Sequence, residues 1–470
     1  MNVKKMVQVI LKPKYFSIIL LSAIWFHLDS NTQNIPVAFE RIYYYSSFDI
    51  KIVLVNYLHV LRFFIPYFFF IIFSFFFYNY LSLKTNNRNL NIAIVFLIIN
   101  FMIQLISLLV YQENILNNFN IILLTLMSLA LFILQFNQNY AEKTFIASIL
   151  LLLIILLWFG SIMTIWYFST ENDTANLYGG WPTSFEVISD LTHNIPRSSG
   201  IGRSAMIILI PLALSFLSSK SKINKLHYFI YFWVFFLIMT TQSRIVLLGL
   251  SLFFVVVITY ITLSEKKLEG ILSKITLIIL IPFFLYLSCI AIKIELMKKA
   301  SYTLNEKNQG SLGNNQGSLG NSFNKFNRRI VRVEDPKSFT SRRFSDWQKI
   351  LEKNTQAVFG VGTMGDRWLI NQSASNLLLY NYSSSGIVGL ILFGLVMARS
   401  FFINFIIIFF KQKKINTKNY ILLSASYIQY FLLGRSLVET SFAVFGIDFL
   451  IFFSAYFFTE HYYINQKLKK

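Results

Sequence analysis

Four arginines, Arg197, Arg203, Arg244 and Arg435, lie at the ends of long apolar stretches and are the residues best suited to chemistry. A guanidinium group is planar and grips a phosphate with two parallel hydrogen bonds, whereas lysine offers a point charge. Arg197 and Arg203 occur in HNIPRSSGIGRSAM, where Pro196 and the glycines permit a close backbone approach. The N-terminus of the helix that follows would favour an anion. We therefore expect these two arginines to bind a phosphate group, the alternative being that they anchor a helix end to lipid headgroups.

Arg244 begins the second of two apolar runs that are joined by a very short turn, in the sequence TTQSRIVLLGL. A charge at this depth is expensive unless it is paired or faces a wet cavity, although it can also snorkel to the interface. Arg435 and Glu439 are four residues apart in LLGRSLVETSF. They are expected either to pair on a helix end or to act on a substrate, with Glu439 as a candidate general base. These patterns predict Arg197, Arg203, Arg244 and Glu439 as the catalytic residues.

The glycines Gly360, Gly362 and Gly365 occur in VFGVGTMGDRW with the spacing of a dinucleotide-binding turn. The surrounding sequence has no strand–helix–strand context, so we interpret these glycines as a loop that packs closely against its neighbours. The five histidines are scattered, none of them paired at the spacing of metal ligands, and Cys289 is the single cysteine. The sequence therefore predicts no metal site, no cofactor and no disulfide bond within the chain.

The composition is that of an integral membrane protein, since 55% of the 470 residues are hydrophobic and only 13% are charged. Successive apolar runs are long enough to cross about 30 Å of hydrocarbon. The predicted fold class is therefore all-α, a polytopic membrane helical bundle with one large extracytoplasmic loop. The net charge of +21 would suggest nucleic acid in a soluble protein. Here most lysines lie in short turns, where they orient the chain and contact anionic lipid, so no nucleic-acid partner is expected.

Apolar runs predict about twelve transmembrane helices, at residues 12–28, 60–82, 90–111, 119–136, 144–168, 203–219, 226–242, 246–264, 272–294, 386–410, 419–433 and 441–459. The first run is short, and a cleaved signal peptide is the rival interpretation; we favour an uncleaved helix because no small-residue cleavage site follows. Alternate connecting segments hold 20 basic residues against 6 in the opposite short loops. The positive-inside rule then places both termini in the cytoplasm.

The expected organisation has four parts, at residues 1–202, 203–294, 295–385 and 386–470, of which the third is the large outer loop. Within it, NQGSLGN occurs twice in tandem over 308–321, which is typical of a flexible linker. From Phe339 to Lys353 the pattern predicts a helix with Phe344, Trp347 and Leu351 on one face. Such a helix would lie on the membrane surface or over the bundle.

Three sequence blocks together resemble the superfamily of O-antigen ligases and O-antigen polymerases. The blocks are RSSGIGR from Arg197, TQSR at 241–244, and FGVGTMG at 359–365 followed by Ser375-Asn376 and by GIVGL at 386–390. The resemblance covers most of residues 195–400, and its specificity comes from the set of blocks and their order. The large outer loop between the ninth and tenth spans agrees with it.

The resemblance implies a membrane glycosyltransferase of the bacterial inner membrane. Members of this superfamily transfer a glycan from an undecaprenyl-diphosphate carrier on the periplasmic face, without a metal ion. Polymerases use another carrier-linked glycan as acceptor, whereas ligases use lipid A–core. By position, Arg197 or Arg203 would hold the diphosphate together with Arg244. A polymerase implies a flippase and a chain-length regulator as partners. The residues expected to contact the substrates are Arg342, Arg343, Trp347, Asn376 and Arg435.

One departure from the superfamily pattern bears on the reaction. Ligases typically have His-Asn where this chain has Ser375-Asn376, and a serine cannot act as a base near neutral pH. The pattern therefore favours a polymerase over a ligase. Without that histidine, the outer carboxylates that could serve as the base are Glu186, Asp190, Asp366 and Glu439. Two alternatives of another class stay open, a lipid-linked oligosaccharide flippase and an envelope assembly factor; a transporter usually shows an internal repeat, which we do not find.

Overall fold

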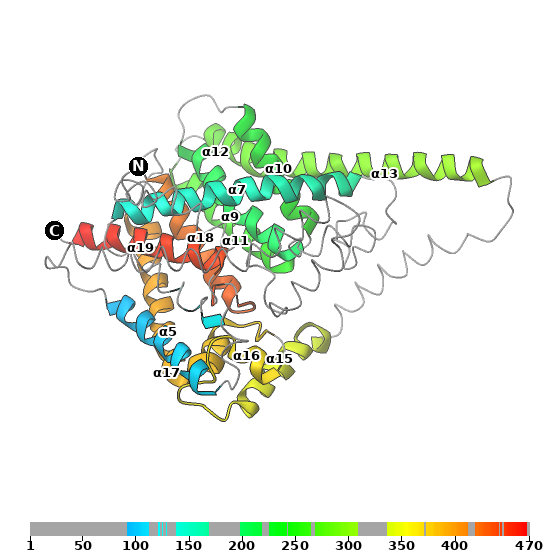
Figure 1. Cartoon of the computed structure of the whole chain (residues 1–470). Helices are drawn as coiled ribbons and strands as arrows, with labels where there is room; N and C mark the ends of the chain where they lie inside the picture. The colour runs from blue at the N-terminus through cyan, green and yellow to red at the C-terminus, as the bar shows by residue number, and fades with distance from the viewer. Residues whose placement is uncertain are drawn as a thin grey trace, which may run out of the picture.

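The structure is a computed structural model that describes residues 92–111, four residues between 121 and 128, 138–168, 198–218, 225–241, 243–264, 268–308, 336–370, 373–411, 419–440, 442–443 and 446–467. Every regular element within these residues is a helix (Figure 1). Several predicted features lie outside the described residues: the spans 12–28 and 60–82, most of 119–136, most of the tandem repeat, Arg197, Glu186 and Asp190.

The helices follow one another along the chain as α5 (Ile92–Tyr111), α7 (Gln138–Phe168), α9 (Ser198–Ser218), α10 (Lys225–Thr241), α11 (Arg244–Ser264), α12 (Leu268–Ile275), η4 (Thr276–Leu280), α13 (Ile281–Asn308), α15 (Pro336–Lys353), α16 (Gly365–Ile370), α17 (Leu377–Phe405), η5 (Ile406–Lys411), α18 (Tyr420–Ser436) and α19 (Ile447–Lys467). Five helical segments in the described part are long and apolar enough to cross a membrane: Ile92–Tyr111, Gly200–Ser218, Arg244–Thr262, Leu268–Lys293 and Leu377–Phe409. The described part of the chain is therefore all-helical and of the membrane type.

Each predicted span that falls largely on described residues overlaps a helix, but several helices are longer than their apolar runs. The helix α13 continues to Asn308, α17 begins at Leu377, and α19 ends at Lys467. Polar residues such as Lys and Glu are good helix formers, so a helix does not stop where the apolar run stops. Hydropathy marks the part of a helix suited to lipid, not the ends of its hydrogen-bonded backbone.

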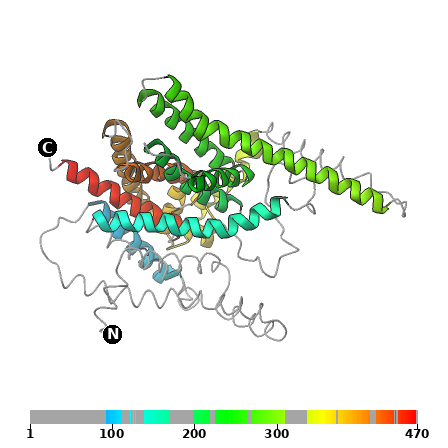
Figure 2. The same ribbon diagram turned by 90° about the horizontal axis from the view of Figure 1, so that it is seen from above.

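The centre of the bundle is α9, which packs against α7, α10, α11 and α18. Its residues from Ala205 to Ile210 are all buried, as expected for a helix surrounded by other helices. In contrast, Leu248, Leu252 and Val255 of α11 are about 60% exposed, and these side chains form an apolar face suited to lipid. Figures 1 and 2 both show α13 at one edge, extending past the other helices.

A kink in α17 separates the membrane-length part of this helix from its beginning. Ser385 (φ −133°, ψ 16°) and Gly386 (φ 66°, ψ −163°) leave the helical conformation. The helix break frees backbone carbonyls, and two of them accept bonds from the preceding loop: Val361 N donates to Ser383 O at 2.9 Å and Gly362 N to Ser384 O at 3.0 Å. The predicted span 386–410 therefore begins at the kink.

The glycines of VFGVGTMG pack closely, which confirms the interpretation made from the sequence. A Cβ atom on Gly360 would lie 2.5 Å from the backbone of Ser384, and one on Gly362 would lie 2.6 Å from the backbone of Leu108. Both glycines also have positive φ angles, 69° and 98°, which other residues rarely adopt. These glycines let the loop fit between α5 and the kink of α17.

A stripe of polar side chains on α5 holds this loop in place. Asn100 donates to Asn381 Oδ1 at 3.3 Å, Ser107 donates to Phe359 O at 2.9 Å, and the Tyr111 hydroxyl donates to Gln356 Oε1 at 2.8 Å. The three α5 residues are seven and four positions apart, so they share one helix face. The loop is thereby fixed to α5, and the chain continues from it through α16 to residues 373–376.

Candidate site at the ends of α9, α18 and α19

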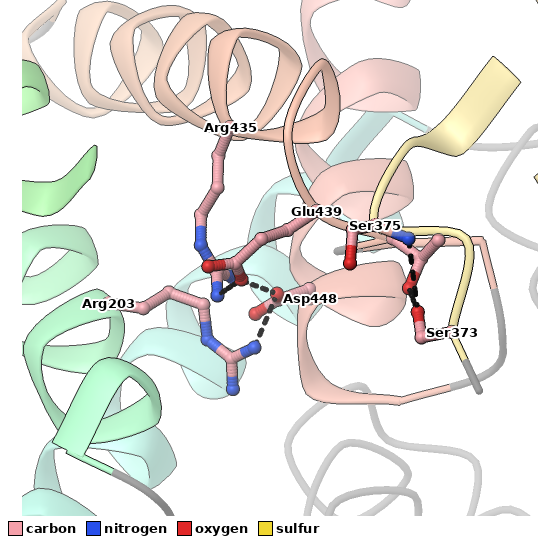
Figure 3. Close-up of polar contacts among 7 residues, drawn as sticks. Arg203, Ser373, Ser375, Arg435, Glu439 and Asp448 are labelled. Atoms are coloured by element: carbon pink, nitrogen blue, oxygen red, sulfur yellow. Dashed lines mark hydrogen bonds and ion pairs between the residues drawn. The ribbon is translucent and has the colours of Figure 1, made fainter. Parts of the chain in front are cut away.

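Two arginines and one aspartate from three different helices form a buried ion-pair cluster (Figure 3). Arg203 Nη1 of α9 lies 2.9 Å from Asp448 Oδ2 of α19, and Arg435 Nη1 of α18 lies 3.2 Å from the same oxygen. The exposed fraction is 2% for the Asp448 side chain, 4% for Arg435 and 21% for Arg203. Two guanidinium groups thus converge on a single oxygen of one carboxylate.

The sequence places each of these charges where its helix favours it. Asp448 lies in the first turn of α19 and Arg435 in the last turn of α18. A carboxylate is stabilised at a helix N-terminus and a cation at a C-terminus. Arg203 follows Gly202, where a Cβ would lie 2.5 Å from Thr241 Oγ1, so the glycine lets the start of α9 meet the end of α10.

Two polar atoms of the cluster are buried without a hydrogen-bond partner in the described part of the chain. They are Asp448 Oδ1, an acceptor, and Arg203 Nε, a donor. A buried polar atom of this kind costs free energy, roughly 1–3 kcal/mol, unless water or a ligand completes it. The cluster therefore offers one unused donor and one unused acceptor to a bound molecule.

Glu439 pairs with Arg435 within the same turn, as its four-residue spacing predicted. Its side chain is 27% exposed, more than that of Arg435 or Asp448. Arg435 holds the Glu439 carboxylate through a strong charge-assisted hydrogen bond.

Arg244 lies at the turn that joins α10 to α11, next to the start of α9. It is the first residue of α11, and its side chain is exposed. Thr241, three residues earlier, packs on Gly202 beside Arg203. The two arginine-containing turns predicted to act together, at Arg203 and Arg244, therefore meet at one end of the bundle.

Residues 373–376 are bonded to the turn that joins α18 and α19. Asn376 accepts from Leu378 N at 2.9 Å and so caps α17, while its Nδ2 donates to Leu437 O at 2.9 Å. Ser373 and Thr440 share a hydroxyl–hydroxyl bond of 3.0 Å. These contacts bring Asn376, predicted to bind substrate, next to Arg435 and Glu439, and they give it a structural role as well.

Ser375 has a left-handed backbone with φ 51°. Such a conformation is uncommon for a residue other than glycine and is held here by the bonds on either side. Strained residues of this kind gather at ligand sites, and Ser375 lies in the segment that borders the ion-pair cluster (Figure 3).

Trp347 of α15 also contacts this segment, because its Nε1 donates to Ala374 O at 2.8 Å. Arg343 is partly exposed on the same helix. Arg342 also lies on α15, and its side chain is not among those that the structure describes. On the predicted face, Phe344 and Leu351 are 60% and 55% exposed and Trp347 is half-buried; the buried side chain Ile350 lies outside that predicted set. Trp347 is thus tied to the site, and the side chains of Phe344 and Leu351 point away from the core.

Asp366, one of the candidate bases, is engaged by the backbone. Its two carboxylate oxygens accept from Arg367 N at 2.9 Å and from Ala374 N at 2.7 Å, and the residue is 2% exposed. Burial raises the pKa of Asp366, and the bonds from Ala374 and Arg367 offset only part of that rise. Asp366 therefore shapes the loop that carries Ala374 and is not presented to a substrate.

Asp448 was not singled out in the sequence. The signal available was a lone acidic residue, in FGIDFL, at the start of the last apolar run. A carboxylate in such a run is a candidate functional residue by default, but nothing local identifies Arg203 as its partner.

No protein-family description, curated protein or solved structure matches this chain. The functional assignment therefore depends on the site geometry and on the sequence blocks that the site contains. Among the described residues, no group of three or more His, Cys, Asp or Glu is placed to hold a metal ion.

Proposed function

We propose that this protein is a membrane glycosyltransferase of the O-antigen polymerase type. It would transfer a glycan from an undecaprenyl-diphosphate carrier to an acceptor glycan during the assembly of lipopolysaccharide or another surface polysaccharide. The observation that carries the proposal is the convergence of Arg203 and Arg435 on Asp448, beside the turn that holds Arg244.

The chemistry of the site suits a diphosphate leaving group. Arg203 keeps a buried Nε donor that no described residue uses, and Arg244 is exposed close by. As the bond to the sugar breaks, charge develops on the diphosphate oxygens, and fixed guanidinium groups stabilise that charge. The ion pair with Asp448 holds Arg203 in place, so little reorganisation is needed when the donor binds.

The proposed topology has about twelve spans, with both termini in the cytoplasm of a bacterial inner membrane. The alternation of basic residues then directs the ends of α9, α18 and α19 that carry the cluster toward the periplasm. A lipid-linked donor would reach these ends from the bilayer, where five of the described helices have the length and apolarity of spans. The segment around α15 and α16 would cover the site from the periplasmic side.

The polymerase assignment depends on Ser375. A ligase, which attaches the glycan to lipid A–core, would be expected to carry a histidine there. The hydroxyl of Ser375 can orient a sugar but cannot accept its proton. Asn376 and Ser373 fix the segment 373–376 to the α18–α19 turn, so the Ser375 position is held in place there.

One observation favours a second candidate, a lipid-linked oligosaccharide flippase. Arg399 of α17 pairs with the buried Glu460 of α19 at 2.6 Å. Beside them, Ser400 and Asn404 bond to Gln429, which also donates to Thr459. Charged and polar groups within membrane helices often mark a transport pathway.

A gel of lipopolysaccharide and surface glycans from a deletion strain tests these functions. A single repeat unit on lipid A–core in that strain indicates a lost polymerase. Bare core with polymer on the carrier indicates a ligase, and carrier-linked units retained on the cytoplasmic face indicate a flippase. Unchanged glycans contradict all three.

Complementation then tests the site. We expect the wild-type gene and the control Lys349→Ala, an exposed cation of α15, to restore the polymer. Arg203→Ala and Arg244→Ala, produced at the same level, should not restore it. Full restoration by either arginine variant would contradict the role of the cluster.

A further inference from the structure

We infer that Asp448, and not Glu439, is the catalytic carboxylate of this site and binds the acceptor sugar hydroxyl through Oδ1. The inference depends on the proposed glycan transfer and assigns a residue role that the sequence patterns did not indicate. The two oxygens of the Asp448 carboxylate have different surroundings.

Oδ2 of Asp448 is occupied and Oδ1 is not. Arg203 and Arg435 both donate to Oδ2, at 2.9 and 3.2 Å. Oδ1 is buried and accepts no hydrogen bond from any described residue. A carboxylate oxygen in such surroundings calls for a donor, and a hydroxyl group of a ligand supplies one.

Arg203 has an unused donor that supports the same inference. The same guanidinium group that holds Oδ2 through Nη1 has a buried Nε with no acceptor among the described residues. A molecule or pair of molecules that presents a hydroxyl to Asp448 and an anionic oxygen to Arg203 would satisfy both atoms. In the proposed reaction these are the acceptor hydroxyl and the donor diphosphate.

The other carboxylates near the site are less suitable. Glu439 is paired with Arg435 and is 27% exposed, so its free oxygen can be solvated by water. Both oxygens of Asp366 accept backbone N–H bonds. Of the described carboxylates at this end of the bundle, Asp448 alone has a buried oxygen with unused capacity.

The proposed reaction at the anomeric carbon is either a single displacement of the diphosphate by the acceptor, or loss of the diphosphate followed by attack of the acceptor. The acceptor oxygen forms a bond to that carbon while the bond from carbon to the diphosphate oxygen breaks. The electron pair of the broken bond leaves on the diphosphate, next to Arg203, and the proton of the acceptor hydroxyl passes to Oδ1. Glycosyl transfer has a transition state resembling an oxocarbenium ion, so a carboxylate suffices as the base. The proton then passes to water or to the released diphosphate.

The test compares Asp448→Asn with Glu439→Gln in the purified full-length protein in nanodiscs. Each substitution removes one negative charge and keeps the shape of the side chain. The asparagine also keeps one oxygen that can accept hydrogen bonds from the arginines. Two quantities are measured: binding of undecaprenyl diphosphate, and transfer with carrier-linked repeat units as donor and acceptor. For Asp448→Asn we expect transfer to fall by about 100-fold or more while binding stays within about threefold of wild type. Glu439→Gln should keep transfer within about tenfold.

Three results would overturn the inference. Transfer by Asp448→Asn at near wild-type rate shows that no base is needed there. Equal loss of binding and transfer shows that Asp448 only holds the arginines. A larger loss in Glu439→Gln than in Asp448→Asn shows that Glu439 is the base. If wild type neither binds undecaprenyl diphosphate nor transfers glycan, the proposed function itself fails, which is a separate outcome.

Should Asp448→Asn not assemble, Asp448→Glu keeps the charge and moves the carboxylate by one methylene. Loss of transfer with retained undecaprenyl diphosphate binding in that variant supports the inference. Transfer at the wild-type rate overturns it, because a displaced carboxylate would no longer meet the same hydroxyl.

Discussion

Arg203 and Asp448, which are far apart in the chain, are joined by a 2.9 Å ion pair between the ends of α9 and α19. The pair is largely buried, and Arg435 adds a second cation to the same carboxylate. Buried charges are costly even when they are paired, so an uncharged core would often be as stable. We therefore interpret this cluster at the ends of α9, α18 and α19 as a site for an anion and not as a source of stability.

Arg244→Ala should abolish glycan transfer without loss of the protein from the membrane. The side chain is exposed, so we expect its removal to leave no cavity in the core. Arg244→Lys should also fail if the contact is a two-bond fork to phosphate, because an ammonium group cannot reproduce that geometry. Polymer length on a gel and the membrane-bound protein level are the measurements. Normal polymer in the lysine variant would show that charge alone is needed.

Arg203→Lys separates donor binding from structure at the ion-pair cluster. Lysine keeps the charge that faces Asp448 but lacks the Nε donor, which is unused in the protein. We expect the thermal midpoint to change little and transfer to fall by about 10- to 100-fold, the range for loss of one transition-state donor. Transfer kinetics and thermal unfolding in detergent check this. An equal decline of stability and transfer would mean that the side chain is structural.

Arg435→Met should destabilise the protein strongly, by about 3–5 kcal/mol, because Asp448 and Glu439 lose their shared buried cation. The loss would appear as a lower thermal midpoint in detergent. As a control, the double variant Arg435→Met, Glu439→Gln removes one uncompensated charge and should recover part of the stability. No recovery would show that the pairing with Glu439 contributes little.

Gly386→Ala should disrupt the junction between α17 and the loop 357–362. The glycine has φ 66°, and a Cβ atom there would collide with the Val358 backbone. Gly394, in the same helix, has nothing within 4 Å of such an atom, so Gly394→Ala is the matched control. We expect the control to be neutral or to gain up to about 1 kcal/mol from helix propensity, and Gly386→Ala to lose both thermal stability and transfer. Similar thermal midpoints for the two variants would contradict the assigned kink.

Arg399 and Glu460 provide a test against the flippase alternative. Removing Arg399 leaves the buried carboxylate of Glu460 without its cation, whereas the double variant Arg399→Met, Glu460→Gln leaves no charge there. If this pair only packs the helices, the double variant should polymerise glycan normally and be more stable than either single variant. Loss of carrier-linked units from the periplasmic face in the double variant would favour transport.

Local sequence was sufficient to predict where the helices lie and which segment must be a tight loop. Apolar runs of membrane length coincide with α5 and α11, because lipid and the protein core both favour apolar side chains along the whole helix. Gly360 and Gly362 were interpretable because backbone strain and close approach are local demands. The pairing of Arg435 with Glu439 follows equally from their four-residue spacing at a helix end, Arg435 in the last turn of α18 and Glu439 just after it.

Only the tertiary structure decided which ends of the helices meet and what their charges do there. Asp448 is paired with arginines of α9 and α18, and a carboxylate oxygen of Asp366 accepts a hydrogen bond from the backbone of Ala374. Phe344 lies on the exposed side of α15. None of this is encoded in spacing along the chain, because an apolar helix face fits many neighbours equally well. The choice among them is made by packing and by the few polar contacts that must be satisfied between helices.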